Sequence, residues 1–307
     1  MYQVMVVGLK GVDSGKTTFS RALLSHLRDE GLNVCGFKPM AGNNIWYDYE
    51  VVSRALSEGR LYGRDAGLLK EESTGEVPEE LINPVHRLWS EPSKIDAATG
   101  VPTFIVDRIT FWPQGKGEDE YEDEDEYGAG DEAGGECEVE VTGGGRDGSG
   151  GLNLLVENAS VHLNGEKRLL RKLRPQAAEV RRVEDAEGLN GLVKAHYGRA
   201  IESARRRIAE EHDAMVIEGY SDAALPAGDV SDLDLVVGVE PWRISVYDPE
   251  RYRNAVRLTT PSYSKEVSTA RVVELLSPKK VVEYRPSRPE ERLDRLKEMM
   301  PEVLGKG

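Results

Sequence analysis

The feature that most constrains this chain is the stretch over residues 4–18, VMVVGLKGVDSGKTT. A short apolar run ends in a glycine-rich turn, and the residues after the turn have apolar positions at helical spacing. This order predicts a strand, a loop and a helix. Small residues let the backbone N–H groups of such a loop point inward, and the helix adds the positive end of its dipole. The stretch therefore predicts a site that surrounds a polyphosphate.

The spacing also predicts the role of each residue in this loop. Lys16 is expected to reach the β- and γ-phosphates of a nucleotide, and the hydroxyl of Thr17 is expected to bind the accompanying Mg²⁺. The strict form of the motif requires Gly where this chain has Lys10, so an ordinary glycine loop between a strand and a helix is the alternative. The predicted nucleotide-binding residues are Asp13, Ser14, Gly15, Lys16, Thr17 and Thr18.

The second strand places another lysine beside this loop. The first helix is expected to end at Gly31, and residues 33–37 read as a buried strand, which makes a β-α-β unit and implies a parallel sheet. Such sheets bind ligands outside the carboxyl ends of their strands. Lys38 directly follows the second strand and is therefore expected at the same edge as Lys16, as a second catalytic lysine. A solvated loop lysine is the alternative.

A later strand is expected to deliver an acid to the same edge. An amphipathic helix over residues 192–208 leads into the apolar run MVIEG at residues 215–219. A carboxylate at the end of such a strand orients Mg²⁺ or its water in P-loop sites. Glu218 is the predicted metal ligand, and Asp213, at the other end of the strand, is a weaker candidate.

The charge of the chain is concentrated in one segment. Residues 118–147 hold 14 acidic residues and one basic residue, which account for −13 of the total net charge of −15 and leave −2 for the rest. A nearly neutral body gives no support to nucleic-acid binding through a basic surface. The glycine-rich acidic segment at 117–151 has too little apolar surface to offset the entropy of ordering it, so it is expected to be disordered. A solvated loop tip or an electrostatic lure for a basic partner would explain it.

The strands around this segment suggest a small insertion. Residues 101–111, 152–156 and 160–163 read as strands, and Asn164-Gly165 reads as a hairpin turn. The predicted fold is an α/β, three-layer parallel sheet with P-loop NTPase topology, formed by residues 1–100 and 176–307. A β-rich insertion at 101–175 is expected to contain the hairpin and the acidic loop.

Other features restrict the protein class. The N-terminus has no cationic region, no run of about eighteen apolar residues occurs, and the two cysteines exclude a disulfide framework. A cytoplasmic protein without a membrane-spanning segment is expected.

Five short segments occur in an order typical of one family. They are GVDSGKTT, the residues Lys38-Pro39-Met40-Ala41-Gly42, RDAGLL from Arg64, INPVHRLWSEP from Ile82 and MVIEG from Met215. Together they resemble the dethiobiotin synthetase family, ATP-dependent enzymes in the same P-loop class as the ParA/MinD-type ATPases. The resemblance implies ATP and Mg²⁺ as cofactors and a small-molecule acceptor. It also implies that Asp65 assists the metal, so the predicted metal set is Thr17, Asp65 and Glu218; a carboxylate that merely favours a helix N-terminus is the alternative for Asp65.

The chain departs from the family where the acceptor binds. Aligned on Lys38, Gly42 stands where the family has a small Ser, and Tyr220, Ser221 and Asp222 stand where it has small residues. The nucleotide half is expected to be retained and the acceptor half to have changed.

Three functions remain open at this point. The leading one is an enzyme that transfers a phosphoryl group from Mg²⁺-ATP to a carboxylate or similar oxyanion on an unknown small acceptor. The second is a nucleotide-dependent regulatory switch that acts through a protein partner, and a homodimer is also open. The third, a nucleoside or polynucleotide kinase, should show an aromatic stacking platform or a basic channel. The absence of an N-K-x-D signature favours ATP over GTP.

Overall fold

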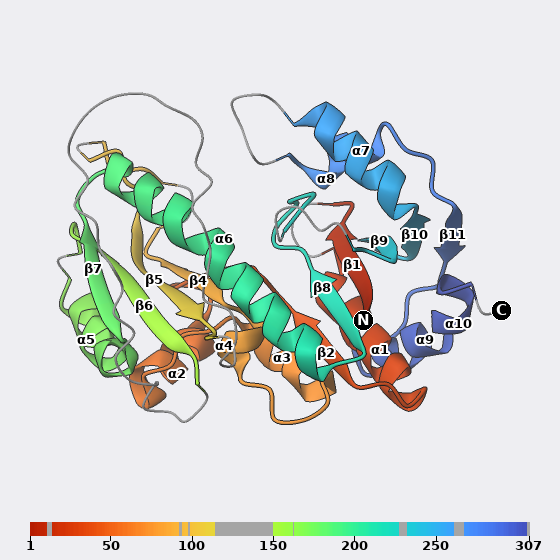
Figure 1. Cartoon of the computed structure of the whole chain (residues 1–307), viewed down its shortest axis with the longest axis horizontal. Helices are drawn as coiled ribbons and strands as arrows, with labels where there is room; N and C mark the ends of the chain where they lie inside the picture. The colour runs from red at the N-terminus through yellow and green to blue at the C-terminus, as the bar shows by residue number, and fades with distance from the viewer. Residues whose placement is uncertain are drawn as a thin grey trace.

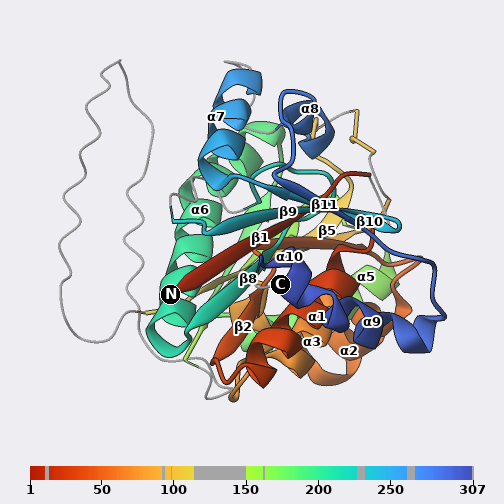
Figure 2. The same cartoon turned by 90° about the vertical axis from the view of Figure 1, so that its right-hand side faces the viewer.

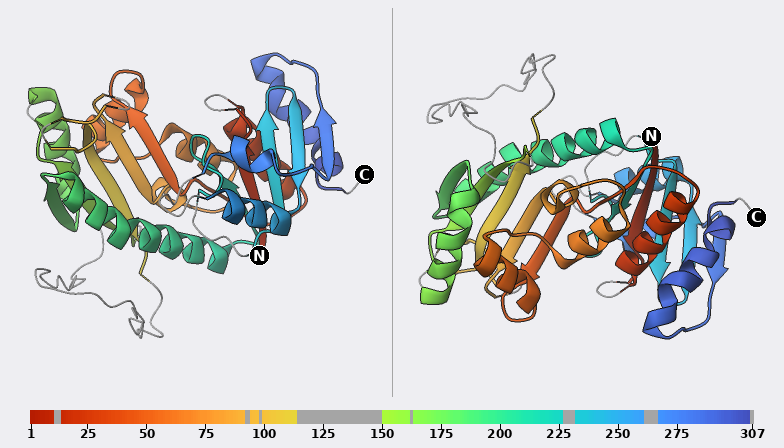
Figure 3. Two further views of the ribbon diagram at one scale, coloured as in Figure 1. Left: turned by 90° about the horizontal axis from the view of Figure 1, so that it is seen from above. Right: turned by 90° about the horizontal axis from the view of Figure 1, so that it is seen from below.

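Two β-sheets and their covering helices make up the protein in the computed structural model, which describes residues 1–10, 14–91, 94–97, 99–113, 150–161, 163–226, 232–260 and 267–305. The helix α6 (Ala186–Glu211) runs along both sheets (Figure 1). Helices cover both faces of the first sheet (Figure 3). The predicted α/β class is confirmed, and the P-loop NTPase topology stays a prediction.

The first sheet has six strands in the order β11-β10-β9-β1-β8-β2. Its four strands β9, β1, β8 and β2 are parallel, with β1 between β9 and β8 (Figure 2). The strands β10 and β11 pair antiparallel at one edge, so the prediction of a parallel sheet holds only for the four-stranded part. The reason is local, because the two-residue turn Pro241-Trp242 between β9 and β10 can join only antiparallel neighbours. The strands are β1 (Tyr2–Gly8), β2 (Val34–Phe37), β8 (Ala214–Glu218), β9 (Leu235–Glu240), β10 (Arg243–Tyr247) and β11 (Lys280–Glu283).

The central strands are continuous apolar runs. Every residue of β8 is buried, and so are residues 3–8 of β1. A parallel strand covered on both faces needs apolar side chains on both, which is why these segments show no alternation. The run that ends at Glu218 therefore places a carboxylate at the end of a wholly buried strand.

The second sheet has five strands in the order β3-β4-β5-β6-β7. Strands β3 with β4 and β6 with β7 are parallel, whereas β5 is antiparallel to both of its neighbours. The strands are β3 (Met40–Asn44), β4 (Val85–Trp89), β5 (Phe104–Phe111), β6 (Leu152–Asn158) and β7 (Glu179–Val183). This sheet is larger than the predicted insertion, since β3 and β4 precede residue 101. The predicted domain boundaries stay predictions.

The predicted hairpin at Asn164-Gly165 is wrong. Asn164 begins the helix α5 (Asn164–Leu173), and residues 160, 161 and 163 belong to no strand. The side chain of Glu166 accepts a hydrogen bond from the backbone N–H of Leu163, 3.3 Å away. This backbone donor at the start of the helix therefore has a partner. Leu169, Leu170 and Leu173 are then buried on one face. These helix signals outweigh the Asn-Gly turn signal.

The acidic segment falls almost wholly outside the described residues, which resume at residue 150 after residue 113. The strands on either side of it are paired, with Phe111 opposite Leu152.

The remaining helices cover the sheets and carry parts of the site. They are α1 (Lys16–Asp29), α2 (Tyr49–Glu58), α3 (Arg64–Glu72), α4 (Glu79–Ile82), α7 (Pro249–Thr259), α8 (Thr269–Val273), α9 (Arg292–Glu298) and α10 (Met300–Val303), with short 3₁₀ turns at Arg174–Gln176 and Pro289–Glu291. The sequence pattern predicts one helix over residues 289–300, whereas the structure has a 3₁₀ turn, α9 and the first residue of α10 there. Across the part of the chain that the structure describes, no helix is long and apolar enough to cross a membrane.

Candidate active site

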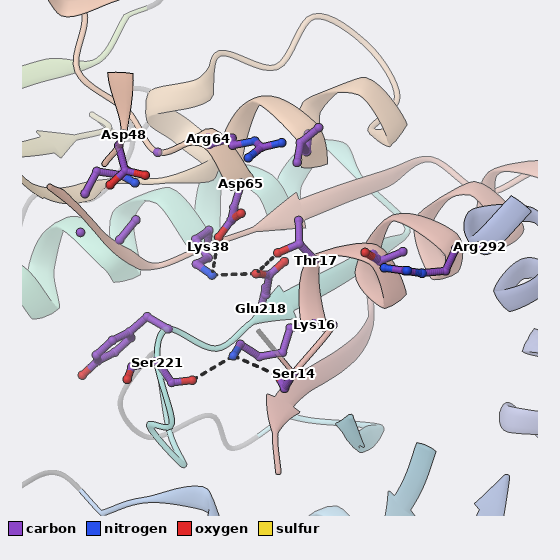
Figure 4. Close-up of a pocket in the computed structure, with 18 residues that line it drawn as sticks. Ser14, Lys16, Thr17, Lys38, Asp48, Arg64, Asp65, Glu218, Ser221 and Arg292 are labelled. Carbon is purple, nitrogen blue, oxygen red and sulfur yellow. Dashed lines mark hydrogen bonds and ion pairs between the residues drawn. The ribbon is translucent and has the colours of Figure 1, made fainter. Parts of the chain in front are cut away.

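A cavity of about 740 Å³ lies where β1, β2 and β8 end at the same edge of the first sheet. Its wall comes from the loop before α1, the residues after β2 and β8, the start of α3 and the first residue of α9 (Figure 4). This is the edge at which a parallel sheet binds ligands. Segments separated by more than 200 residues therefore meet in one site.

The junction between loop and helix is shaped by two glycines. Gly15 precedes α1 with φ of 91°, a left-handed conformation that favours glycine, and no side chain caps the helix there. At Gly8, an added Cβ would lie 2.7 Å from Ser14 Oγ and 2.9 Å from Lys16 Nζ. Because Gly8 has no Cβ, Ser14 and Lys16 can approach its backbone closely. The backbone at this end of the helix is therefore surrounded by small residues and forms a cradle.

Lys16 points across the cavity toward the segment after β8. Its Nζ donates to the carbonyl oxygen of Ser221 at 2.9 Å and to Ser14 Oγ at 3.3 Å. Burial and, second, the charge of Lys38 lower the pKa of the Lys16 ammonium. Among the described residues no carboxylate forms an ion pair with it, so Lys16 is a buried cation available to an anionic ligand.

Glu218 is the centre of the site. Its Oε1 accepts hydrogen bonds from Thr17 Oγ1 at 2.8 Å and from Lys38 Nζ at 2.6 Å (Figure 4). The residue is fully buried, and its second oxygen, Oε2, has no hydrogen-bond partner in the described part of the chain. A buried carboxylate oxygen without a donor is costly, which indicates a missing cation or donor.

Lys38 is held between two carboxylates. Its Nζ lies 2.6 Å from Glu218 and 3.0 Å from Asp65 Oδ2, and it also donates to the carbonyl oxygen of Gly219. Burial by itself lowers the pKa of this ammonium, but the two carboxylates outweigh burial and raise the pKa above its ordinary value. Lys38 is therefore a fixed positive charge.

The donor atoms fit a hard cation. Thr17 offers a hydroxyl, and Glu218 and Asp65 offer carboxylates, which are the oxygen ligands that Mg²⁺ prefers. No group of three or more His, Cys, Asp or Glu side chains positioned to hold a metal ion exists within the described ranges. A cation at this site would thus take only part of its ligands from the protein, as Mg²⁺ does when a phosphate supplies the others.

Most of the residues predicted for the site lie together. Asp213 does not, since it caps the opposite end of β8, where Oδ2 accepts a hydrogen bond from the backbone of Asn33 at 2.9 Å. Asp13 lies outside the described residues. The catalytic, nucleotide-binding and metal-binding roles of all the predicted site residues stay predictions. The predicted residues that line the cavity are Ser14, Gly15, Lys16, Thr17, Thr18, Lys38, Asp65 and Glu218.

Other lining residues were not predicted. Asn43, Asp48 and Arg64 also line the cavity, and Arg292 lines it from α9. Arg64 directly precedes the predicted Asp65 and could have been included with it. Nothing in the sequence near Arg292 connects it with a loop almost 280 residues earlier.

Of the three residues after Gly219 that are expected to alter the acceptor site, two line the cavity and one does not. Tyr220 and Ser221 line the cavity, and Ser221 has a φ of 46°, which is uncommon for a residue other than glycine. Asp222 is not among the lining residues; its carbonyl oxygen instead accepts the backbone N–H of Thr269.

A turn of exposed aromatic residues borders the cavity. In this aromatic turn, residues 44–49, the side chains of Trp46, Tyr47 and Tyr49 are 73%, 80% and 78% exposed. The turn is held by Asn44, whose backbone N–H donates to Asp48 Oδ2 at 2.7 Å and whose Oδ1 accepts from the N–H of Trp46 at 2.8 Å. The aromatic side chains are therefore displayed on an ordered turn next to the cavity.

Comparison with known proteins gives a similarity over part of the chain. The chain is 39% identical over 79 residues to ATP-dependent dethiobiotin synthetase BioD 2 of Escherichia coli (strain K12), and 38% identical over 79 residues to the protein of that name from Salmonella typhimurium (strain LT2). The matched stretch is 25% of this chain and spans 30% of the length of each relative. No family model matches the chain. The similarity agrees, over a quarter of the chain, with the resemblance to the dethiobiotin synthetase family.

Proposed function

We propose that this chain is a Mg²⁺-ATP-dependent enzyme, related to dethiobiotin synthetase, that transfers the γ-phosphoryl group of ATP to an oxyanion of a small acceptor. One observation carries the proposal: Lys16, Thr17, Lys38, Asp65 and Glu218 converge on one cavity at the N-terminus of α1. Phosphoryl transfer is catalysed mainly by positioning and by charge stabilisation, and this cluster offers both.

The arrangement supports a direction for the bound triphosphate. Lys16 and the first turn of α1 would hold the β- and γ-phosphates. Lys38 lies on the far side of Glu218, where the γ-phosphate would meet the acceptor. Its fixed charge would stabilise the negative charge that develops between the two. Mg²⁺, held by Thr17 and Glu218 with Asp65 beside them, would neutralise the phosphate oxygens.

The acceptor is proposed to differ from that of the dethiobiotin synthetases. A Cβ at Gly42 would lie 2.8 Å from Trp89 Nε1, so a Ser at this position would require the indole to move. The cavity also has a polar wall, with Asn43, Asp48 and Arg64 among its lining residues. These features support an acceptor site built from different residues for a polar small molecule.

Replacement of Lys16 tests the proposal. Lys16→Ala should lower the rate of ATP hydrolysis by about 10² to 10³, the usual effect of losing one preorganised charged donor. Lys167→Ala, an exposed lysine on α5, is the matched control and should hydrolyse ATP like the parent. Equal hydrolysis rates in the parent and in folded Lys16→Ala protein would show that the loop is wrongly assigned.

A nucleotide-dependent switch is the second candidate. The aromatic turn favours it, because clustered exposed aromatic side chains are typical of protein-binding surfaces. A metabolite screen by thermal shift, with a non-hydrolysable ATP analogue present, separates the two functions. The switch predicts that no metabolite adds stability or raises phosphate release. A metabolite that stimulates phosphate release many-fold would leave the enzyme as the function.

A further inference from the structure

We propose that Arg292 binds the α-phosphate of ATP and closes the nucleoside end of the cavity. This inference rests on the proposed function and extends it to a residue that belongs to none of the predicted motifs. Arg292 is the first residue of α9 and lines the same cavity as Thr17 and Thr18. In Figure 4 its side chain lies on the side of Thr17 that faces away from Lys38.

The position of Arg292 is fixed by the packing of α9 along α1 (Figure 2). Lys297 Nζ lies 2.5 Å from Asp29 Oδ2 and donates to Ser25 Oγ at 3.0 Å, both toward the end of α1. Leu296 is buried in the core. Because Lys297 meets the end of α1 and Arg292 lies by its start, the two helices run in the same direction. The anchor at Lys297 thus holds Arg292 beside the first turn of α1.

The direction of the triphosphate decides which group Arg292 meets. Lys38 and the polar acceptor wall lie on one side of Thr17, so the γ-phosphate must point there to be transferred. The α-phosphate and the nucleoside then extend to the other side, toward Thr18 and Arg292. Within the described residues the guanidinium forms no hydrogen bond or ion pair. The Arg292 side chain is exposed, and a guanidinium without a protein hydrogen bond or ion pair is suited to bind a phosphate through two parallel hydrogen bonds.

Two ligands test the contact, the non-hydrolysable analogue AMP-PNP and inorganic tripolyphosphate, with affinities measured by calorimetry in the presence of Mg²⁺. Arg292→Ala should raise the Kd for both ligands about tenfold or more, since both carry a phosphate at the α position. Arg292→Lys, which keeps the charge without the planar fork, should recover part of the affinity. Arg295→Ala is the matched control, because Arg295 is exposed on the same helix and pairs with Glu291.

The outcomes separate this inference from the proposed function. If parent protein binds neither ligand, the proposed function fails. If the parent binds both and Arg292→Ala binds them equally well, only the role of Arg292 fails. Weaker binding of AMP-PNP alone would place Arg292 against the base or ribose and would overturn the α-phosphate contact. Unchanged melting temperatures of the variants would show that lost affinity does not come from unfolding.

Discussion

The buried pair of Lys38 and Glu218 makes each residue depend on the other. Glu218→Gln keeps the shape of the side chain but removes the charge that Lys38 faces at 2.6 Å. Removal of one partner from a buried pair costs about 3 to 5 kcal/mol, and the remaining contact of Lys38 with Asp65 at 3.0 Å places the expected cost at the lower end of this range. We expect Glu218→Gln to lose roughly this much unfolding free energy in urea denaturation, and to lose ATP turnover.

A double variant separates stability from catalysis. Lys38→Met combined with Glu218→Gln removes both charges and should regain most of the lost unfolding free energy, while ATP hydrolysis stays absent. Additive losses of stability in the double variant would contradict a direct pairing between the two side chains.

The lowered pKa of Lys16 predicts a pH dependence of nucleotide binding. Burial, and then Lys38, make the free protein release this proton below the ordinary lysine value of 10.5. The affinity for AMP-PNP should therefore decline in that alkaline range, whereas Lys16→Arg, which stays charged, should show no such decline. The unliganded protein should gain stability from Lys16 over the same range, because the unfolded chain holds the proton more tightly. An alkaline decline that is identical in Lys16→Arg would assign the titration to another group.

Three of the predicted residues that line the cavity share a simple origin. Lys16, Lys38 and Glu218 each lie at or just beyond the carboxyl end of a parallel strand, and the β-α-β rule converts that position into one edge of the sheet. Arg292 follows no such rule, because its place depends on how α9 packs along α1. Asn43 lies on β3 and Asp48 lies in the aromatic turn that follows it, and the relation of both to the cavity depends on a second sheet that was not foreseen.

The two ends of the helix α1 each have a glycine, and the two glycines form a matched pair for substitution. Gly15 and Gly31 have φ of 91° and 88°, and an added Cβ would meet no atom closer than 3.8 Å at either position. Alanine at each should therefore cost a similar amount, about 1 to 2 kcal/mol of left-handed strain, measured as unfolding free energy. Only Gly15→Ala should also weaken AMP-PNP binding, because only Gly15 shapes the loop at the N-terminus. Equal affinity in both variants would count against a backbone cradle.

Two of the strands that sequence patterns missed lack a continuous apolar pattern. The strands β3 and β7 read MAGNN and EVRRV, and both are only partly buried at the edges of the second sheet. An edge strand needs few apolar residues, so it gives little periodic signal. By contrast, the sequence pattern predicts a helix over residues 49–58, and α2 has these bounds.

Most of the net charge of the whole molecule lies in residues 118–147, which are outside the described residues. Deletion of residues 118–147 would change the net charge from −15 to −2 and would leave the paired strands β5 and β6 joined by a short linker. We expect the unfolding free energy to change by no more than about 0.5 kcal/mol and ATP hydrolysis to be retained. A loss of hydrolysis in folded deletion protein would give the acidic segment a part in the active site.

Sheet membership was the least predictable property of the whole molecule. The second sheet joins strands from residues 40–44 to residues 179–183, and its order depends on contacts between segments far apart in the chain. Local patterns identify a strand but do not name its neighbours, which is why three predicted strands were grouped as a small unit.

The aromatic turn gives this protein a built-in optical reporter. Trp46 is largely exposed to water next to Asn43 and Asp48, whereas Trp112 is buried and Trp89 is partly buried. Trp242, at the turn between β9 and β10, is the other exposed indole, and a Phe there would leave Trp46 as the main one in contact with water. Indole emission shifts to shorter wavelength when water is displaced. A molecule that binds over the aromatic turn should therefore shift the emission of Trp46, without any attached dye.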